Sequence, residues 1–204
     1  MVKKVYWFIP LGVILFLTLI LGCEEFGKVD QGRVIAYDQE KGLCSLIRDT
    51  STDPKNPDYS NLPPIVYELP HNPAEVGPAP KPGLRMKLDI QNRQIIIFDP
   101  ATQNFNTINY TLVDQKENVN KDNPLVFDEE KKQPKEFPLV DRDNKTISIY
   151  SKRQEILVTF TLPDEYFNLP DSTWDVGDEV RIYYKQEGKA LRFMNISQTD
   201  IYKK

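Results

Sequence analysis

The sequence is poor in the residues that most often carry enzyme chemistry. Its 204 residues include one histidine, His71, and two cysteines, Cys23 and Cys44. A zinc site needs several His or Cys ligands at regular spacing, and histidine is the commonest general base. The sequence also has no Gly-rich phosphate loop, G-x-S-x-G elbow or C-x-x-C-H haem motif. It therefore favours a non-enzymatic protein with no metal and no cofactor, in which His71 is an exposed loop residue.

The chain also lacks any block of charge of one sign. It has 26 Lys and Arg against 30 Asp and Glu, a formal net charge of −4, and the two signs are mixed along its length. Non-specific nucleic-acid binding needs clustered basic residues that neutralise phosphates, so this function is disfavoured. The acidic cluster at 171–179 lacks the regular alternation of oxygen ligands found in an EF-hand loop, so a calcium site is not predicted.

One long apolar run is present, at the N-terminus. Lys3 and Lys4 precede 18 uncharged residues, Val5 to Gly22, and Cys23 follows at once. A positive segment, an apolar segment and a small residue before a cut are typical of a signal peptide. As a helix the run would span only about 27 Å, less than the roughly 30 Å of a bilayer core. Cleavage is therefore favoured, with a retained anchor or an ordinary secretory peptide as alternatives.

Cys23 favours a lipoprotein signal over the other two alternatives. Ile20-Leu21-Gly22-Cys23 resembles the lipobox of bacterial lipoprotein precursors, which implies acylation of Cys23 and removal of residues 1–22. Several acyl chains hold a protein stably at a membrane, whereas one does not. Leu21 departs from the small or β-branched residue usual there, which leaves the retained anchor open. Glu24 differs from the Asp that resembles an inner-membrane retention signal, so the outer membrane is favoured over the inner. Cys44 is then left without a disulfide partner and is expected to be a buried, inert thiol.

The rest of the chain is predicted to be all-β. In Leu84–Ile90, apolar and charged residues alternate, as in a strand with one face on a core and one in water. A turn and a second strand at 94–98 follow. The same arrangement returns at 180–185 and 190–193.

The two halves resemble each other over a longer stretch, which predicts an internal repeat. Residues 34–47 fall without a gap on residues 137–150, and 65–70 fall on 158–163. Five strands with a long connection after the third are typical of an OB-like barrel. We therefore expect two tandem five-stranded OB-like β-barrels. The predicted segments are a signal peptide (1–22), a lipid tether (23–32), a first barrel (33–113), a linker (114–135) and a second barrel (136–204).

Aromatic residues are the most plausible binding resource of the second predicted barrel. Barrel modules often use such side chains to stack sugars, bases or a partner's surface. Tyr183 alternates with Ile182 and Tyr184, which places it on the solvent face beside Arg181. The candidate binding residues are Tyr183, Trp174, Tyr166 and Arg181.

Three segments carry a resemblance of the whole chain to a known family. They are residues 27–34 just after the predicted lipid site, residues 98–105, and residues 162–167. Together they resemble a family of Gram-negative bacterial lipoproteins that is defined only as a domain of unknown function. The resemblance implies an envelope protein and supplies no activity, cofactor or site.

The sequence therefore predicts a lipid-anchored protein of the cell envelope, facing the periplasm. Its expected function is to bind a partner protein close to the membrane, because the predicted tether is short. The alternative is a module that binds a glycan or small ligand on the aromatics of the second barrel.

Overall fold

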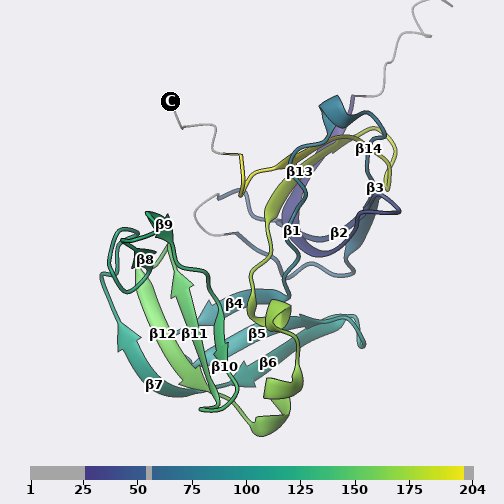
Figure 1. Cartoon of the computed structure of the whole chain (residues 1–204). Helices are drawn as coiled ribbons and strands as arrows, with labels where there is room; N and C mark the ends of the chain where they lie inside the picture. Colours follow the sequence, from purple (N-terminus) through teal and green to yellow (C-terminus); the bar gives the residue numbers. More distant parts are fainter. Residues whose placement is uncertain (1–25, 54–56, 200–204) are drawn as a thin grey trace, which may run out of the picture.

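The chain folds almost entirely into β-strands. The computed structural model describes residues 26–53 and 57–199, and Figure 1 shows them as several small sheets. Helix in this described part is limited to short 3-10 turns, which are η1 (Pro73–Glu75), η2 (Asp164–Asn168) and η3 (Asp171–Trp174). The all-β prediction is thus confirmed. The predicted signal run and Cys23 lie outside the described residues.

The largest sheet is formed by the two ends of the described chain. Its strand order is β14-β13-β1-β2-β3, with antiparallel neighbours. Its strands are β1 (Lys28–Asp38), β2 (Leu43–Arg48), β3 (Ile65–Glu68), β13 (Glu179–Tyr184) and β14 (Ala190–Asn195). The first strand therefore begins at Lys28, before the residue 33 at which the first barrel was predicted to start.

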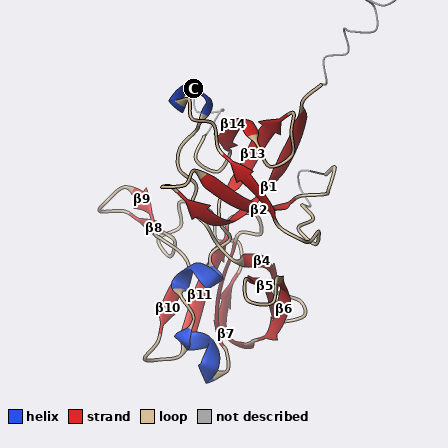
Figure 2. Ribbon diagram, turned by 90° about the vertical axis from the view of Figure 1, so that its right-hand side faces the viewer, coloured by secondary structure: helices blue, strands red, loops and turns tan. Residues whose placement is uncertain are grey.

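The middle of the chain forms the other sheets, which lie below the five-stranded sheet in Figure 2. A four-stranded sheet has the order β10-β11-β12-β7, and a three-stranded sheet has the order β4-β5-β6. A short hairpin of β8 and β9 completes the set. The strands are β4 (Arg85–Asp89), β5 (Gln94–Asp99), β6 (Asn104–Asn109), β7 (Thr111–Lys116), β8 (Phe127–Asp128), β9 (Gln133–Pro134), β10 (Leu139–Asp141), β11 (Thr146–Ser151) and β12 (Ile156–Thr161).

No sheet of the described chain closes into a barrel. The edge strands of the five-stranded sheet, β3 and β14, are linked by a single parallel bridge, between Glu68 and Lys189. The predicted repeats also do not form separate sheets, since β1–β3 from the first range share a sheet with β13 and β14 from the second. Hairpin patterns in the sequence report local pairing, but they do not specify which hairpins meet over long distances. The prediction of tandem OB-like barrels is therefore not confirmed.

The local correspondence between the halves does appear in the strand register. Cys44 and Leu46 of β2 pair with Tyr67 and Ile65 of β3. At the positions aligned with them in the sequence, Ile147 and Ile149 of β11 pair with Phe160 and Val158 of β12. The positions aligned in the sequence are thus paired in the same register in β2–β3 and in β11–β12.

Two connecting segments cross where the strands are exchanged between the halves. The chain leaves β3 and reaches β4 through Gly83, and it leaves β12 and reaches β13 through Gly177. The Gly83 amide donates to the Val34 carbonyl at 3.0 Å, and the Asp178 amide donates to the Lys81 carbonyl at 2.8 Å. The Arg85 amide, at the start of β4, donates to the Asp175 carbonyl at 2.8 Å. Backbone hydrogen bonds therefore fix the crossing of the two segments.

Three hydrophobic clusters hold this arrangement together. One fills the concave side of the five-stranded sheet, around Val34, Tyr67 and Ile182. A second joins the four-stranded and three-stranded sheets and includes Phe160 and Trp174. The third and smallest packs β2 against β4 and β5, with Ile47, Tyr59, Met86 and Phe98 as its buried members. This third cluster lies between the five-stranded sheet and the rest of the molecule, beside the cleft described below.

Candidate functional site: a basic cleft and an exposed aromatic strip

Two of the predicted binding aromatics lie in or against the core. Trp174 at the end of η3 has no exposed surface, and its ring meets that of half-buried Tyr166 edge-on, with 6.5 Å between centroids. Both belong to the cluster that joins the four-stranded and three-stranded sheets. Their proximity in the sequence reflects packing of the 3-10 turns onto that core, so they do not form a platform with Tyr183.

Tyr183 and Arg181 lie on the outer face of β13, as their alternation predicts. Tyr183 is 36% exposed and pairs with Val29 of β1. Its ring lies directly over Gly27, where a Cβ would approach within 2.1 Å of the ring. Arg181 reaches the neighbouring strand, where its Nη2 donates to Gln31 Oε1 at 2.8 Å. The phenol ring therefore packs over the backbone of Gly27 and remains partly exposed to solvent.

Exposed apolar side chains also occur on the strands next to this tyrosine and just before β1. Phe26 is 94% exposed, Val29 55% and Leu191 45%. Val29 lies at the start of β1, opposite Tyr183, and Phe26 lies two residues before that strand, both within the predicted tether; Leu191 lies on β14, the strand beside β13. We call Phe26, Val29, Tyr183 and Leu191 the outer strip. Single exposed apolar residues need no explanation, whereas a group of them on adjacent strands indicates a contact surface.

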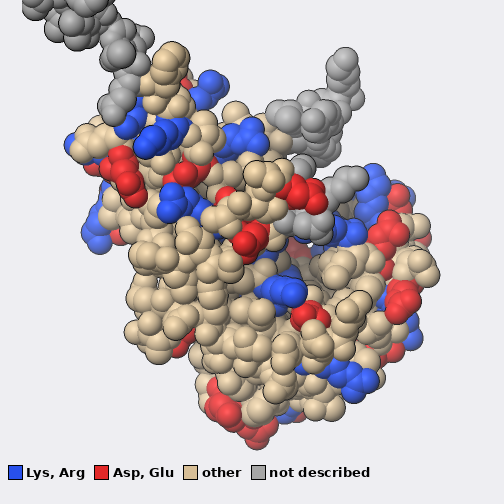
Figure 3. All heavy atoms as spheres, turned by 180° about the vertical axis from the view of Figure 1, so that it is seen from behind, with Lys and Arg blue, Asp and Glu red and all other residues tan. Residues whose placement is uncertain are grey.

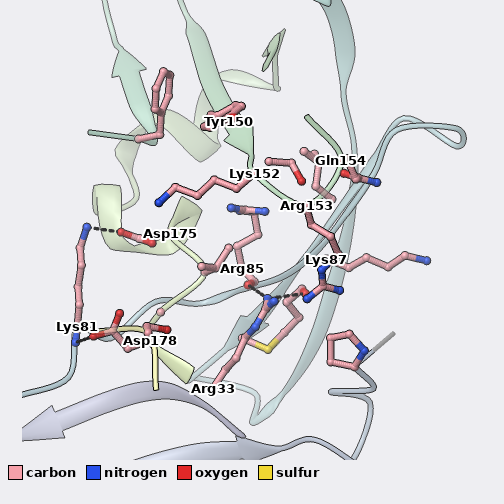
Figure 4. A pocket seen from close by; sticks show the side chains of 18 of the residues that line it. Arg33, Lys81, Arg85, Lys87, Tyr150, Lys152, Arg153, Gln154, Asp175 and Asp178 are labelled. Atoms are coloured by element: carbon pink, nitrogen blue, oxygen red, sulfur yellow. Dashed lines mark hydrogen bonds and ion pairs between the residues drawn. The ribbon is translucent and has the colours of Figure 1, made fainter. Parts of the chain in front are cut away.

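A second feature, a cleft of about 1570 Å³, lies where the larger sheets meet. Its lining carries eight basic and five acidic side chains, in a chain whose net charge is −4. Figure 3 shows that basic and acidic side chains are otherwise mixed over the surface seen from behind. Figure 4 shows the cleft with Arg33 and Arg85 near its base and Lys152 and Arg153 on the opposite wall. The local excess of positive charge marks the cleft as a candidate site for an anion.

Arg85 is the buried cation of this cleft. It is 9% exposed, and its Nε donates to the Trp174 carbonyl at 2.8 Å. Burial lowers the pKa of its guanidinium to about 10; Arg33 acts in the same direction and Asp175 against it. Within the part of the chain that the structure describes, no carboxylate forms an ion pair with Arg85, because Asp175 pairs with Lys81 instead. Arg85 is thus charged at neutral pH, buried and without a counterion among these residues.

Arg33 and Tyr59 complete the base of the cleft. Arg33 Nη1 donates to the Met86 carbonyl at 3.1 Å, and its guanidinium carbon lies 4.3 Å from the centre of the Tyr59 ring. Tyr59 is 6% exposed, and its hydroxyl has no hydrogen-bond partner in the described chain. Burial raises the pKa of this hydroxyl, which keeps it a neutral donor. Residues 57–64, which lead into β3, therefore bring a buried donor to Arg33.

Sequence reasoning missed this cleft because of a β-bulge. Strict alternation in Leu84–Ile90 places Arg85 and Lys87 together on the solvent face. The register of β4 against β5 shifts between these two residues, so Arg85 and Met86 are both buried while Lys87 is exposed. A bulge re-aims side chains in this way and is common beside functional sites. Only the position of Arg85 next to Gly83, in a chain segment rich in proline, could have signalled an irregular start to the strand.

The remaining chemical candidates are inert or solvent-exposed. Cys44 is fully buried, as expected, and burial raises the pKa of its thiol to about 12. The His71 side chain is 96% exposed and lies 3.9 Å from Glu68. Across residues 26–53 and 57–199, no group of three His, Cys, Asp or Glu side chains could hold a metal ion.

The family is settled by comparison with known proteins. Residues 25–204 match a family described as Domain of unknown function (DUF4881). The chain belongs to the DUF4881 family. No curated protein and no solved structure matches it. The DUF4881 domain thus covers both the outer strip and the cleft, and among its described residues no helix is long and apolar enough to cross a membrane.

Proposed function

We propose that the chain is a non-enzymatic envelope protein, anchored by lipid at Cys23, that binds a partner protein through the outer strip. The outer strip carries this proposal, because it places a partly exposed tyrosine and further exposed apolar side chains at the end of the domain nearest Cys23. Tyrosine and arginine are enriched at the centres of protein interfaces.

The position of the strip favours a membrane-proximal partner. Strand β1 begins at Lys28, so six residues, Cys23 to Lys28, separate the lipid from the sheet. Fully extended, these residues would reach at most about 20 Å. Phe26 and Val29 then lie close to the membrane, most simply the outer membrane, given Glu24. Basic residues flank the strip at Lys28, Arg181 and Arg192, so the partner is expected to present an apolar surface with an acidic rim.

The glycan alternative has less support from the geometry. Glycan platforms stack sugar rings on open aromatic faces, but Trp174 is buried and Tyr166 packs against it. Tyr183 alone remains open, on a different sheet. An amphipathic strip with one partly exposed tyrosine fits a protein surface better than a sugar ring.

Anchoring through Cys23 has a direct test. Cys23→Ser removes the thiol that is acylated, so we expect the variant to leave the outer-membrane fraction or to accumulate as an unprocessed precursor. The wild-type protein should show, by intact-mass spectrometry, loss of residues 1–22 together with added acyl mass, and globomycin should block this processing. Cys44→Ser is the matched control and should leave the lipid mass unchanged. An unacylated wild-type chain that retains residues 1–22 would contradict the lipoprotein proposal.

Partner binding through the strip is tested by a tyrosine substitution. Tyr183→Ser should reduce recovery of the partner about tenfold or more in a pull-down with the full chain from solubilised membranes, because a central interface tyrosine often contributes 2 kcal/mol or more. A photo-crosslinker at Leu191 should label the same partner. The control is Val113→Ser, which alters an exposed apolar residue of another sheet, on β7, and should leave recovery of the partner unchanged.

Two outcomes would contradict the binding of a partner protein through the outer strip. Equal recovery with Tyr183→Ser and the wild type would remove the strip from the interface. Binding of the Cys23→Ser chain to phosphatidylglycerol vesicles that is lost in Tyr183→Ser, with no protein crosslinked at Leu191, would assign the strip to the lipid surface instead.

A further inference from the structure

We infer that the cleft between the sheets binds a small molecule bearing an oxyanion, a phosphate or a carboxylate, through Arg33, Arg85 and Tyr59. This site is independent of the outer strip and of the lipid anchor. It is built from four segments far apart in the sequence: β1, residues 57–60, β4 and the turn between β11 and β12.

The first step of the argument is the cost of burying Arg85. A buried charge is costly unless it is paired and hydrogen-bonded. Arg85 is 9% exposed, and the one hydrogen bond of its side chain to the described chain is from Nε to the Trp174 carbonyl. Its two terminal nitrogens face the cleft (Figure 4). A guanidinium with its planar fork left open is the group that best matches a bound carboxylate or phosphate.

The second step is the arrangement around this fork. Arg33 brings a second guanidinium next to Arg85, fixed by the Met86 carbonyl and by the Tyr59 ring. Two adjacent like charges repel each other, and an anion between them would relieve that repulsion. The Tyr59 hydroxyl is a buried donor without an acceptor in the described residues. Two cations and a neutral donor therefore line the base of the same cleft, where an anion would give them an acceptor.

The third step concerns the acidic side chains of the cleft. Asp175, which acts on Arg85, and Asp178 line the cleft on the segment before β13, and both have other partners. Asp175 pairs with Lys81 Nζ, and Asp178 Oδ2 accepts from the Lys81 amide at 2.9 Å and from Asn195 Nδ2 at 2.8 Å. They hold the crossing segments in place, which leaves the charge of the two arginines available to a ligand.

The walls of the cleft indicate what else the ligand carries. Ile96 and Phe105 line one side, and Phe137 and Tyr150 line another. Each of these four is partly buried. Small-molecule sites typically combine such apolar walls with a few placed polar groups. A ligand with an acidic head and an apolar or aromatic body fits this lining better than an inorganic ion alone.

Calorimetry on the detergent-solubilised full chain tests the site. The probes are phenyl phosphate, benzoate and inorganic phosphate, each at matched ionic strength in chloride. We expect saturable binding of one molecule per chain, tighter for the aromatic anions than for inorganic phosphate. Comparing phenyl phosphate with benzoate shows whether the head group is a phosphate or a carboxylate. Absence of saturable binding for all three probes would overturn the inference.

Variants locate the binding. Arg85→Met should weaken the affinity for the best probe about tenfold or more, as expected for a lost charged hydrogen bond. Tyr59→Phe should weaken it about threefold without lowering the melting temperature, because the hydroxyl has no partner to lose. Arg192→Gln is the matched control, since it removes an exposed arginine remote from the cleft and should leave the affinity unchanged.

Two results would overturn the assignment even if binding is seen. Unchanged affinity in Tyr59→Phe and Arg85→Met would place the anion elsewhere. An equal loss in Arg192→Gln would show that the binding reflects net charge alone. If Arg85→Met fails to fold, Tyr59→Phe still decides, because it changes a single unpaired oxygen.

Discussion

Replacing Gly177 with alanine is expected to lower the free energy of unfolding by about 3 kcal/mol or more. Gly177 has φ +69°, a region that L-residues with a side chain rarely adopt. A Cβ there would also lie 2.3 Å from the Val34 carbonyl oxygen and 2.8 Å from the Gly83 amide nitrogen. Both obstacles are backbone atoms at the crossing of the two segments, so neither can move without breaking the crossing.

Substitutions at two other glycines separate the backbone strain from the steric collision. Gly42 has φ +64° with no atom within 4 Å of its Cβ position, so Gly42→Ala should cost only the backbone strain, about 1–2 kcal/mol. Gly83 has no such φ, but its Cβ would lie 2.2 Å from the Gly177 amide nitrogen, so Gly83→Ala reports the collision. Urea unfolding followed by circular dichroism measures all three variants. If Gly177→Ala lowers the free energy of unfolding no more than Gly42→Ala does, the two crossing segments must be able to move apart to make room for the Cβ.

The hairpins of this fold could be read from the sequence because their signals are local. Asp38, Asp89 and Asp141 each end a strand, and each carboxylate accepts the backbone N–H of the residue three positions on. These bonds hold the pKa of all three carboxyls below the usual value. Turn chemistry and alternation together specify both strands and their register. The predicted strands at 94–98 and 180–185 therefore lie within one residue of β5 and β13.

The long-range arrangement could not be read in the same way. Exchange of strands at Gly83 and Gly177 depends on two segments 94 positions apart meeting backbone to backbone. The local sequence of neither segment predicts that contact. Strands β6 and β7 likewise follow each other with Tyr110 alone between them, yet they join different sheets. Besides the bulge at Arg85, the cleft was missed for the same reason, since Arg33, Tyr59 and Arg85 come to line one cleft only once the sheets are packed.

Replacing Trp174 with alanine is expected to cost about 3–5 kcal/mol. The indole has no exposed surface and belongs to the core that joins the four-stranded and three-stranded sheets. Most globular proteins have only about 5–15 kcal/mol of stability, so the variant should be severely destabilised or unfolded at 37 °C. Its midpoint in urea, followed by circular dichroism, measures the loss.

Trp174→Phe distinguishes this core role from the role in ligand stacking that the sequence suggested. The indole Nε1 is buried without a hydrogen-bond partner in the described chain, so its removal should offset part of the lost packing. We expect a cost of about 1 kcal/mol, with unchanged binding to any glycan or partner. A Trp174→Phe variant of wild-type stability that lost ligand binding would instead show that the indole reaches the surface in the bound state. The backbone carbonyl of Trp174 accepts a hydrogen bond from Arg85 Nε at 2.8 Å. Because Trp174→Phe keeps this carbonyl, the variant should also keep the anion affinity of the cleft. Trp174 would then support the site through its main chain and not through its ring.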